Sequence, residues 1–253
     1  MTDSTLQSPL SDADIASIER ATLDAVAPAS VEAINGWLLP FDPSTIGRAK
    51  SAVPLRHHSL RAQDVATISA RYQAHGMTPG FRVVDVAGLA DVCAALASQG
   101  LAPQQPTLTQ VGSVSSLRTF CQGTPAIVSQ QPTAEWASVY TAPGFDPVDG
   151  AFRVQALSRS ATVVYACVVE DGQAVAAGTA SLSQGWASVH GMRTVVGQRG
   201  RGLAGRVLAG LAQAALAQGL ERVFLQVEED NAGAIALYRK AGFHTAWRYH
   251  YWR

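Results

Sequence analysis

The sequence predicts an α+β protein in which antiparallel strands are followed by helix, strand, helix and strand. Three observations in its C-terminal half carry this prediction. Two strand-like segments, Thr162–Glu170 and Ala174–Leu182, are joined by an Asp-Gly pair, which is typical of a two-residue hairpin turn. A long segment, Gly202–Gln218, repeats its apolar side chains at helical spacing. The last segment, Thr245–Trp252, is rich in the aromatic residues that strands favour.

The N-terminal part of the chain alternates helical and strand-like segments. Ser11–Ala27 has apolar residues at near-helical spacing behind a Ser-Asp start, which predicts an amphipathic helix. Two strands are expected at Ile34–Phe41 and Arg48–Leu55, on either side of an Asp-Pro turn. The remaining predicted elements are helices at Asp64–His75 and Leu89–Ser98, strands at Phe81–Val86 and Thr107–Val114, and a short helix carrying Trp136 and Tyr140.

The C-terminal part continues with a third strand at Trp186–Val196, ahead of the long helix. A short apolar strand, Val223–Val227, and a helix over Ala232–Lys240 complete the order of elements. Between the two parts, residues 121–150 are rich in Gly, Pro and Gln, as linkers often are. We therefore predict two domains, over residues 1–123 and 124–253.

The composition and charge do not point to nucleic acid or to a membrane. The 19 basic and 19 acidic side chains balance, and no apolar run reaches the roughly 20 residues that a membrane span needs. The polar N-terminus does not resemble a signal peptide, so we expect a cytoplasmic protein. Its three cysteines are odd in number and share no metal-ligand spacing. We expect reduced thiols, no disulfide and no metal site.

The most informative stretch runs from Thr194 to Gly205. A strand ends there, a tight turn containing Gly200 and Gly202 follows, and a long helix begins. Converging backbone N–H groups at such a turn form an anion site suited to a pyrophosphate, and Arg199 and Arg201 add positive charge. An ordinary glycine-rich turn with solvated arginines would look the same.

The pattern Gly200-x-Gly202-x-x-Gly205 also fits a dinucleotide-binding Rossmann turn, and Glu228 and Glu229 follow at a spacing suited to a ribose ligand. The expected context argues against this alternative, because the turn follows an antiparallel meander rather than opening a βαβ unit.

Two further patterns resemble one known family. Arg199-x-x-Gly202-x-Ala204 matches the [Q/R]-x-x-G-x-[G/A] signature of the GNAT N-acetyltransferases. The segment Leu225-Gln-Val-x-x-x-Asn231-x-x-Ala-x-x-Leu-Tyr238-x-x-x-Gly-Phe243 is similar to the strand and helix that follow the acyl-CoA loop in that family. The resemblance spans about 90 residues. It implies the GNAT fold, a mixed, largely antiparallel sheet flanked by helices, which binds acetyl-CoA as co-substrate.

The resemblance also implies roles for individual residues. Backbone groups of Met192, Arg193 and Thr194 would pair with the pantetheine arm, and Asn231 would steady the same region. Tyr238 would be the general acid that protonates the departing thiolate; the alternative is a purely structural aromatic side chain. The N–H groups expected to hold the pyrophosphate are those of Arg199, Gly200, Arg201, Gly202, Leu203, Ala204 and Gly205.

The general base is not given by these motifs. Relatives that acetylate ribosomal-protein N-termini carry a Glu five residues before the Asn, whereas this chain has Gln226, which cannot accept the proton. His190 lies on a strand expected to line the cleft and has a suitable intrinsic pKa, so it is our candidate base. A structural histidine is the alternative, and Glu228 and Glu229 are further candidates.

The N-terminal half contains softer patterns of the same kind. Gly36-Trp-Leu-Leu39, the segment Arg48–Leu55 and Tyr72-x-x-x-Gly-Met-x-Pro-x-Phe81 resemble the first half of bacterial two-domain GNAT proteins. This resemblance implies a tandem protein whose degenerate N-terminal GNAT-like domain covers the acceptor side without binding a second coenzyme A. An unrelated α+β domain is the alternative.

Together these features predict a transferase that moves an acetyl group from acetyl-CoA to an amine of a small molecule or peptide, by direct attack in a ternary complex. Two alternatives stay open from sequence. One is a protein N-terminal acetyltransferase, against which Gln226 argues. The other is a degenerate acyl-CoA-binding regulatory module, against which the intact loop and Tyr238 argue. The oligomeric state cannot be read from the sequence.

Overall fold

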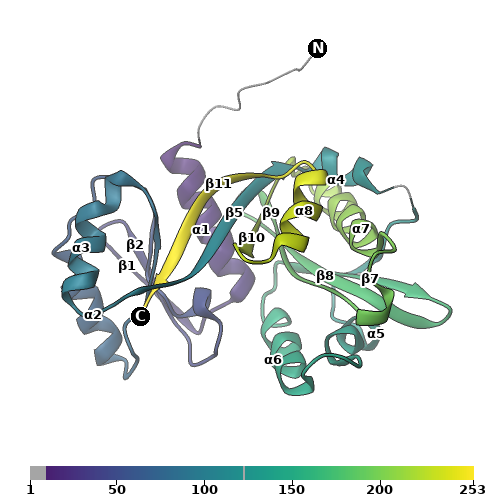
Figure 1. The fold of residues 1–253 in the computed structure, drawn as a ribbon, viewed down its shortest axis with the longest axis horizontal. Coiled ribbons are helices and arrows are strands. Elements are labelled where there is room, and N and C mark those ends of the chain that lie inside the picture. The colour runs from purple at the N-terminus through teal and green to yellow at the C-terminus, as the bar shows by residue number, and fades with distance from the viewer. Residues whose placement is uncertain (1–9, 122) are drawn as a thin grey trace, which may run out of the picture.

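The structure is a computed structural model that describes residues 10–121 and 123–253. The segment expected not to be a signal peptide falls mostly on residues 1–9, outside the described residues. In the described part of the chain, no helix is long and apolar enough to cross a membrane. The helices lie around a long central sheet, with α2 and α3 at one end and α4 to α7 at the other (Figure 1).

The central sheet has eight strands in the order β4-β11-β5-β10-β9-β8-β7-β6. Every neighbouring pair is antiparallel except β9 and β10, which run parallel. A mixed, largely antiparallel sheet is thus confirmed. Its strands are β4 (Phe81–Val84), β5 (Pro103–Ser113), β6 (Ile127–Ser129), β7 (Val163–Glu170), β8 (Gln173–Ser183), β9 (Trp186–Thr194), β10 (Arg222–Glu228) and β11 (His244–Trp252). A small second sheet holds β1 (Ser30–Ile34), β2 (Trp37–Phe41) and β3 (Val53–Pro54).

Helices cover both faces of the large sheet. In β10, Val223, Leu225 and Val227 pack into the core beneath α7, whereas Phe224 packs into the core beneath α1. Successive strand residues point to opposite faces, so Gln226 and Glu228 lie on the α1 face. The helices are α1 (Asp12–Val26), α2 (Asp64–Ala74), α3 (Ala90–Ser98), α4 (Val114–Phe120), α5 (Ala134–Ser138), α6 (Pro147–Leu157), α7 (Leu203–Ala217) and α8 (Ala232–Lys240).

The large sheet is continuous across the predicted domain boundary at residue 123. Strand β5 comes from the first segment and pairs with both β10 and β11 of the second, and β4 pairs with β11. The long β5 and β11 run side by side through the middle of the molecule (Figure 1). The division into two domains stays a prediction about chain organisation, but its two segments share one sheet.

Several predicted elements differ from the structure. The expected strand Ile34–Phe41 is broken by a turn at Asn35 and Gly36, both with positive φ, so that β1 and β2 form a hairpin. The expected strand Arg48–Leu55 begins instead in a 3-10 turn, η1 (Gly47–Ala49), and only the two-residue β3 near its end is a strand. Helices α4 and α6 and strand β6 were not predicted.

The argument against a βαβ unit was wrong. Strands β9 and β10 pair in parallel over three residue pairs, and α7 is the crossover between them. The antiparallel meander of β7, β8 and β9 precedes this unit, as expected, but the sheet then turns parallel. Chain order alone could not show this, because the direction of β10 depends on α7 crossing the sheet.

Candidate active site

The site begins where β9 and β10 separate. The two strands pair only from Ala187–Val223 to Val189–Leu225, so within the described residues β9 has no partner strand on that side beyond Val189. A bulge near Gly191, whose φ is +62°, interrupts the pairing of β9 with β8. Backbone groups of Met192 to Thr194 therefore border an open cleft, where an extended ligand could add to the strand edge.

The turn before α7 presents a row of free N–H groups. Gly200 and Gly202 both adopt positive φ, of 78° and 76°, which glycine accepts without strain. The N–H groups of Arg199 and Gly205 donate to carbonyls within the turn. Within the described residues, those of the five positions between them donate to no acceptor. The positive end of the α7 dipole lies at the same turn, and free N–H groups at a helix start are suited to binding an anion.

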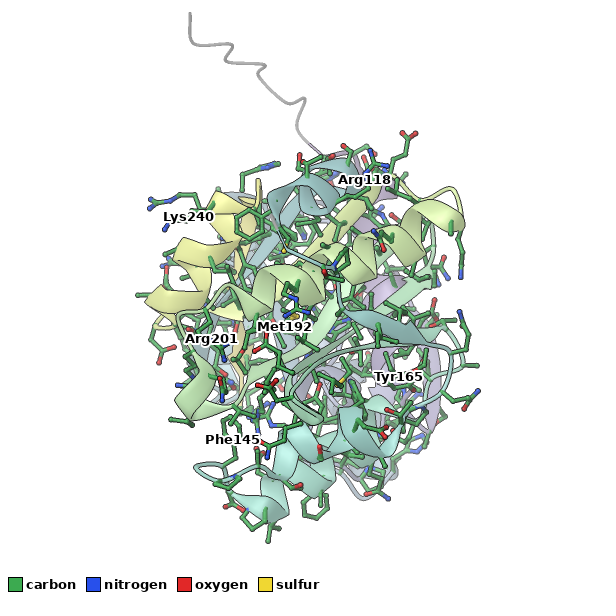
Figure 2. All side chains as sticks on the ribbon, turned by 90° about the vertical axis from the view of Figure 1, so that its right-hand side faces the viewer. Arg118, Phe145, Tyr165, Met192, Arg201 and Lys240 are labelled. Atoms are coloured by element: carbon green, nitrogen blue, oxygen red, sulfur yellow. The ribbon has the colours of Figure 1, made fainter. Side chains whose placement is uncertain are left out.

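A cavity of about 1100 Å³ lies against this turn. Met192, Arg201 and Phe145 lie on the face that Figure 2 shows. Arg201 is not a free cation, because its guanidinium lies 2.9 Å from the carboxylate of Glu170. The cavity walls include every residue that the sequence assigned to the cofactor, namely Met192, Arg193, Thr194, Arg199, Gly200, Arg201, Gly202, Leu203, Ala204, Gly205 and Asn231.

Tyr238 lines the same cavity from α8. Its ring packs edge-on against Phe243 at a centroid distance of 5.7 Å, and the residue is 8% exposed. Its hydroxyl makes no hydrogen bond within the described residues, so it is available to a ligand. Burial raises the pKa of Tyr238 to about 12, and the phenol therefore keeps its proton at neutral pH.

Asn231 has a local structural task as well. Its side-chain oxygen accepts a hydrogen bond of 3.1 Å from the N–H of Ala234 and so caps α8. A cap of this kind contributes about 1 kcal/mol. Since α8 carries Tyr238, the cap also fixes the position of that side chain relative to the cavity.

A second cavity, of about 660 Å³, opens on the α1 face of the sheet. His190 and Gly191 line it, and the next residue, Met192, lines the cofactor-side cavity, so the two cavities adjoin along β9. We call them the acceptor-side and cofactor-side cavities. Gln226 and Glu228 of β10 line the acceptor-side cavity, as their place on the α1 face requires.

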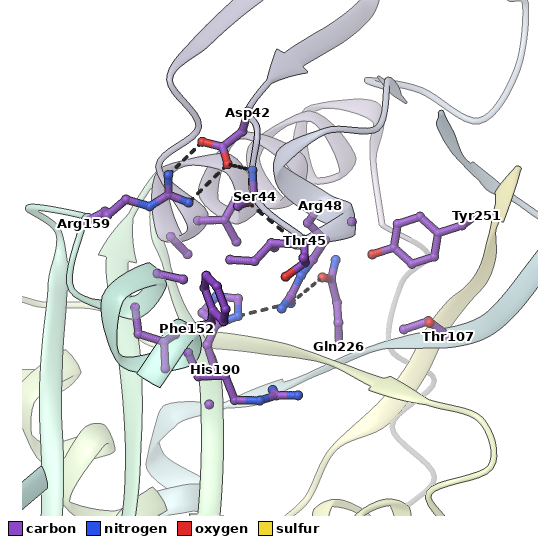
Figure 3. A pocket seen from close by; sticks show the side chains of 18 of the residues that line it. Asp42, Ser44, Thr45, Arg48, Thr107, Phe152, Arg159, His190, Gln226 and Tyr251 are labelled. Carbon is purple, nitrogen blue, oxygen red and sulfur yellow. Dashed lines mark hydrogen bonds and ion pairs between the residues drawn. The ribbon is translucent and has the colours of Figure 1, made fainter. Parts of the chain in front are cut away.

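His190 is enclosed by hydrogen-bonding partners (Figure 3). Its Nδ1 lies 3.3 Å from Nη1 of Arg48, and its Nε2 bonds to the hydroxyl of Ser188. Since Arg48 can only donate, Nδ1 is the acceptor and Nε2 carries the hydrogen. Burial, and then the charge of Arg48, lower the pKa of His190 well below its usual value. Both effects oppose the imidazolium that a general base must form.

Arg48 is the residue that sequence reasoning placed in a motif without giving it a role. It extends from η1 into the acceptor-side cavity and donates from Nη1 to Oε1 of Gln226 at 3.0 Å (Figure 3). No local pattern signals this position, because η1 and β10 lie 178 residues apart in the chain.

The carboxylates of the acceptor-side cavity differ in their partners. Asp42 is bound by Arg159 at 2.8 Å, and Asp149 by Arg153 at 2.7 Å. Among the described residues, Glu228 has only a neutral partner, the amide of Gln105 at 2.8 Å. The neighbouring carboxylate of Glu229 instead faces Arg248 at 3.5 Å.

No group of three or more His, Cys, Asp or Glu side chains that could hold a metal ion occurs within residues 10–121 and 123–253. Cys93, Cys121 and Cys167 are free thiols.

Solved structures share this architecture. A GCN5-related N-acetyltransferase from Kribbella flavida superposes with a TM-score of 0.69 at 16% identity, covering 94% of each chain. A tandem GNAT protein from the clavulanic acid biosynthesis pathway reaches 0.60 at 15% identity, covering 96% of each chain. A GCN5-related N-acetyltransferase from Sphaerobacter thermophilus reaches 0.54 at 16% identity, covering 96% of this chain and 93% of the other. At these identities the likeness shows the GNAT fold.

The sequence comparisons give the family itself. No curated protein matches the sequence. A family described as "Probable histone acetyltransferase Rv0428c C-terminal" matches residues 12–252, which is nearly the whole chain. The match crosses residue 123 without a break, as the large sheet does. The chain belongs to this acetyltransferase family and, with it, to the GNAT superfamily.

Proposed function

We propose that the protein transfers an acetyl group from acetyl-CoA to a primary amine of a small molecule or peptide. The observation that carries the proposal is the pair of adjoining cavities on the two sides of β9. One presents an anion site and an available phenol, and the other presents polar groups on the opposite face of the sheet. Two substrates that meet along one strand edge can react directly in a ternary complex.

The cofactor-side cavity fits acetyl-CoA by its chemistry. The N–H groups at Gly200 to Ala204 would bind the pyrophosphate, and the open edge of β9 at Met192 to Thr194 would pair with the amide groups of the pantetheine arm. Tyr238 on α8 borders the same cavity, where its phenol would face the thioester sulfur.

The reaction then needs two proton movements. The neutral amine attacks the thioester carbonyl, the new C–N bond forms, and the C–S bond breaks. Tyr238 gives its proton to the leaving sulfur, and the proton lost from nitrogen restores the phenol through water. Because its pKa is raised, Tyr238 starts this sequence fully protonated.

We assign the deprotonation of the amine to Glu228 through water, rather than to His190. The lone pair of His190 Nδ1 is occupied by Arg48, whereas the Glu228 carboxylate borders the cavity and is held by no arginine among the described residues. Since attack requires a neutral amine, a carboxylate close to the ammonium form both attracts it and accepts its proton.

The test is a substitution in the anion site with a matched control. Gly202→Glu places a carboxylate where the pyrophosphate would bind, and Gly219→Glu introduces the same charge at another positive-φ glycine with open space around it, at the other end of α7. A hundredfold excess of acetyl-CoA over its Kd stabilises the fold by about 2.7 kcal/mol. We expect this stabilisation in the Gly219→Glu control and not in Gly202→Glu.

Calorimetric titration of the unmodified chain gives the stoichiometry in the same experiment. We expect one acetyl-CoA per chain, because the N-terminal segment lacks a phosphate loop of its own. Equal stabilisation of both glutamate variants by acetyl-CoA would refute the assignment of the pyrophosphate site to this turn. A stoichiometry of two would refute the prediction that the N-terminal domain binds no coenzyme A.

A further inference from the structure

Two arginines of the acceptor-side cavity lack an acidic partner. Arg48 is half-buried, and its Nη1 donates only to neutral groups, Nδ1 of His190 and Oε1 of Gln226. Across the described residues, its Nε and Nη2 donate to nothing, and no carboxylate lies within ion-pair distance of it. Arg253 is likewise without a carboxylate partner there, and its guanidinium stacks on the ring of Tyr251 at 4.7 Å.

These two guanidinium groups belong to one wall of the cavity. Nη2 of Arg253 lies 2.7 Å from the point that a Cβ on Gly47 would occupy, and Gly47 directly precedes Arg48. The backbone of Arg253 is held by two hydrogen bonds with Ala102. Arg48 and Arg253 thus both line the acceptor-side cavity, and the Arg253 guanidinium lies beside the backbone at Gly47.

Among the described residues, no acidic group nearby pairs with Arg48 or Arg253. Glu228 contacts only the amide of Gln105. Asp42 and Asp149 are bound by Arg159 and Arg153. Burial raises the pKa of Glu19, and the charges of Arg82 and Arg48 oppose this increase. The buried Glu19 carboxylate is bonded to the equally buried Arg82. A half-buried guanidinium whose contacts are neutral is unfavourable unless an anion joins it, and its planar N–H groups match a carboxylate best.

We propose that the acceptor carries a carboxylate, which Arg48 and Arg253 bind, while its amine faces Glu228. This inference rests on the proposed function and narrows the acceptor to a free amino acid or a short peptide whose carboxylate lies near the reacting amine. An apolar side chain suits the remaining wall, because Phe152 lines the same cavity with 57% of its surface exposed.

The same charges disfavour a lysine-rich protein tail as acceptor. The matching family is described as a histone acetyltransferase, and such a substrate would bring several positive charges to the mouth of the cavity. Among the described residues the cavity has two arginines without a counter-charge, Arg48 and Arg253, against one carboxylate held only by a neutral amide, Glu228. One lysine could meet Glu228, but the further positive charges of a tail would be repelled by the arginines.

The experiment compares amino acids with their carboxamides as acceptors of the full-length protein. The members of each pair differ in the negative charge that Arg48 would bind. The carboxamide also has the less basic amine, so intrinsic reactivity favours the amide. We expect kcat/KM to favour the acid by roughly 10- to 100-fold, the range for hydrogen bonds to a charged group. Arg48→Gln should remove this preference and Arg48→Lys should keep part of it. Arg118→Gln, an exposed arginine of α4, should keep all of it.

A second measurement separates this inference from the proposed function. Calorimetry measures the binding of N-acetyl amino acids in the presence of coenzyme A. We expect these acids to bind the unmodified chain and Arg118→Gln, and to bind Arg48→Gln at least tenfold more weakly. If no amine is acetylated and this Arg48-dependent binding persists, the proposed function fails and the carboxylate site at Arg48 and Arg253 stands. Three results would overturn the carboxylate site: amides used as well as acids, an acid preference that survives Arg48→Gln, or a lysine-rich peptide preferred to both.

Discussion

Replacing Tyr238 by Phe removes one hydroxyl from the cofactor-side cavity and leaves the ring in place. The hydroxyl has no hydrogen-bond partner within the described residues, and the contact with Phe243 is made by the ring. The free energy of unfolding should therefore change by less than about 0.5 kcal/mol. If the phenol protonates the leaving sulfur, kcat should fall by roughly 10²–10⁴-fold, which corresponds to about 3–5 kcal/mol of transition-state stabilisation.

The assay is steady-state release of free thiol, combined with calorimetric measurement of acetyl-CoA affinity. We expect affinity to stay within about twofold, because the lost interaction belongs to the transition state. The pKa of Tyr238 is about 12, so the acid form persists and its ionisation should produce no falling limb below pH ~10.

Tyr72→Phe serves as the matched control for this prediction. Its hydroxyl is buried and donates to the carbonyl of Pro40 at 3.1 Å, away from both cavities. This variant should lose about 1 kcal/mol of stability and keep its turnover. The reverse pattern, a Tyr238→Phe enzyme with unchanged kcat, would refute the assignment of the general acid.

Two further predictions concern the acceptor side. Glu228→Gln should lower kcat/KM by at least about 100-fold, whereas Glu229→Gln, whose carboxylate faces Arg248, should stay near the original value; equal losses would contradict the assignment. His190→Gln should leave unchanged any limb of the pH–rate profile near pH 6–7, because the pKa of His190 is lowered by burial. The folded state then binds fewer protons than the unfolded state, so His190 contributes stability above pH ~6.5 that is lost on acidification. Between pH 7 and 5, urea unfolding should show a smaller loss of stability in His190→Gln than in the original chain. Identical losses would contradict a lowered pKa of His190.

The cofactor-side cavity could be predicted from sequence because its parts lie close together in the chain. Strand end, glycine turn and helix start follow one another from Thr194 to Gly205, and α8 begins and ends where its periodicity predicts, at Ala232 and Lys240. Each of these features is governed by local backbone preference and helical spacing. The residues assigned to the cofactor consequently line one cavity.

The acceptor-side cavity could not be predicted in this way. It is built from η1, α6, β5, β9, β10 and β11, and each of its contacts depends on where distant segments pack. Helix α6 was missed although Asp146 and Pro147 form a good start, because Gly150 interrupts its helical pattern. The environment of His190 shows the same limit. Its pKa is lowered by burial and then by the charge of Arg48, and Arg48 lies 142 residues away in sequence.

The place of β11 in the sheet has a consequence for synthesis of the chain. Strand β4 pairs within the large sheet only with β11, and the two neighbours of β5 are β10 and β11. On the ribosome, β4 and β5 therefore emerge more than a hundred residues before any of their sheet partners, with their edges unpaired. Non-local pairings of this kind form slowly and leave strand edges open to wrong partners. The growing chain thus depends on β11 to close the sheet. A protein that stops after Lys240 would keep the turn from Arg199 to Gly205 but would leave β4 and one edge of β5 exposed to aggregation.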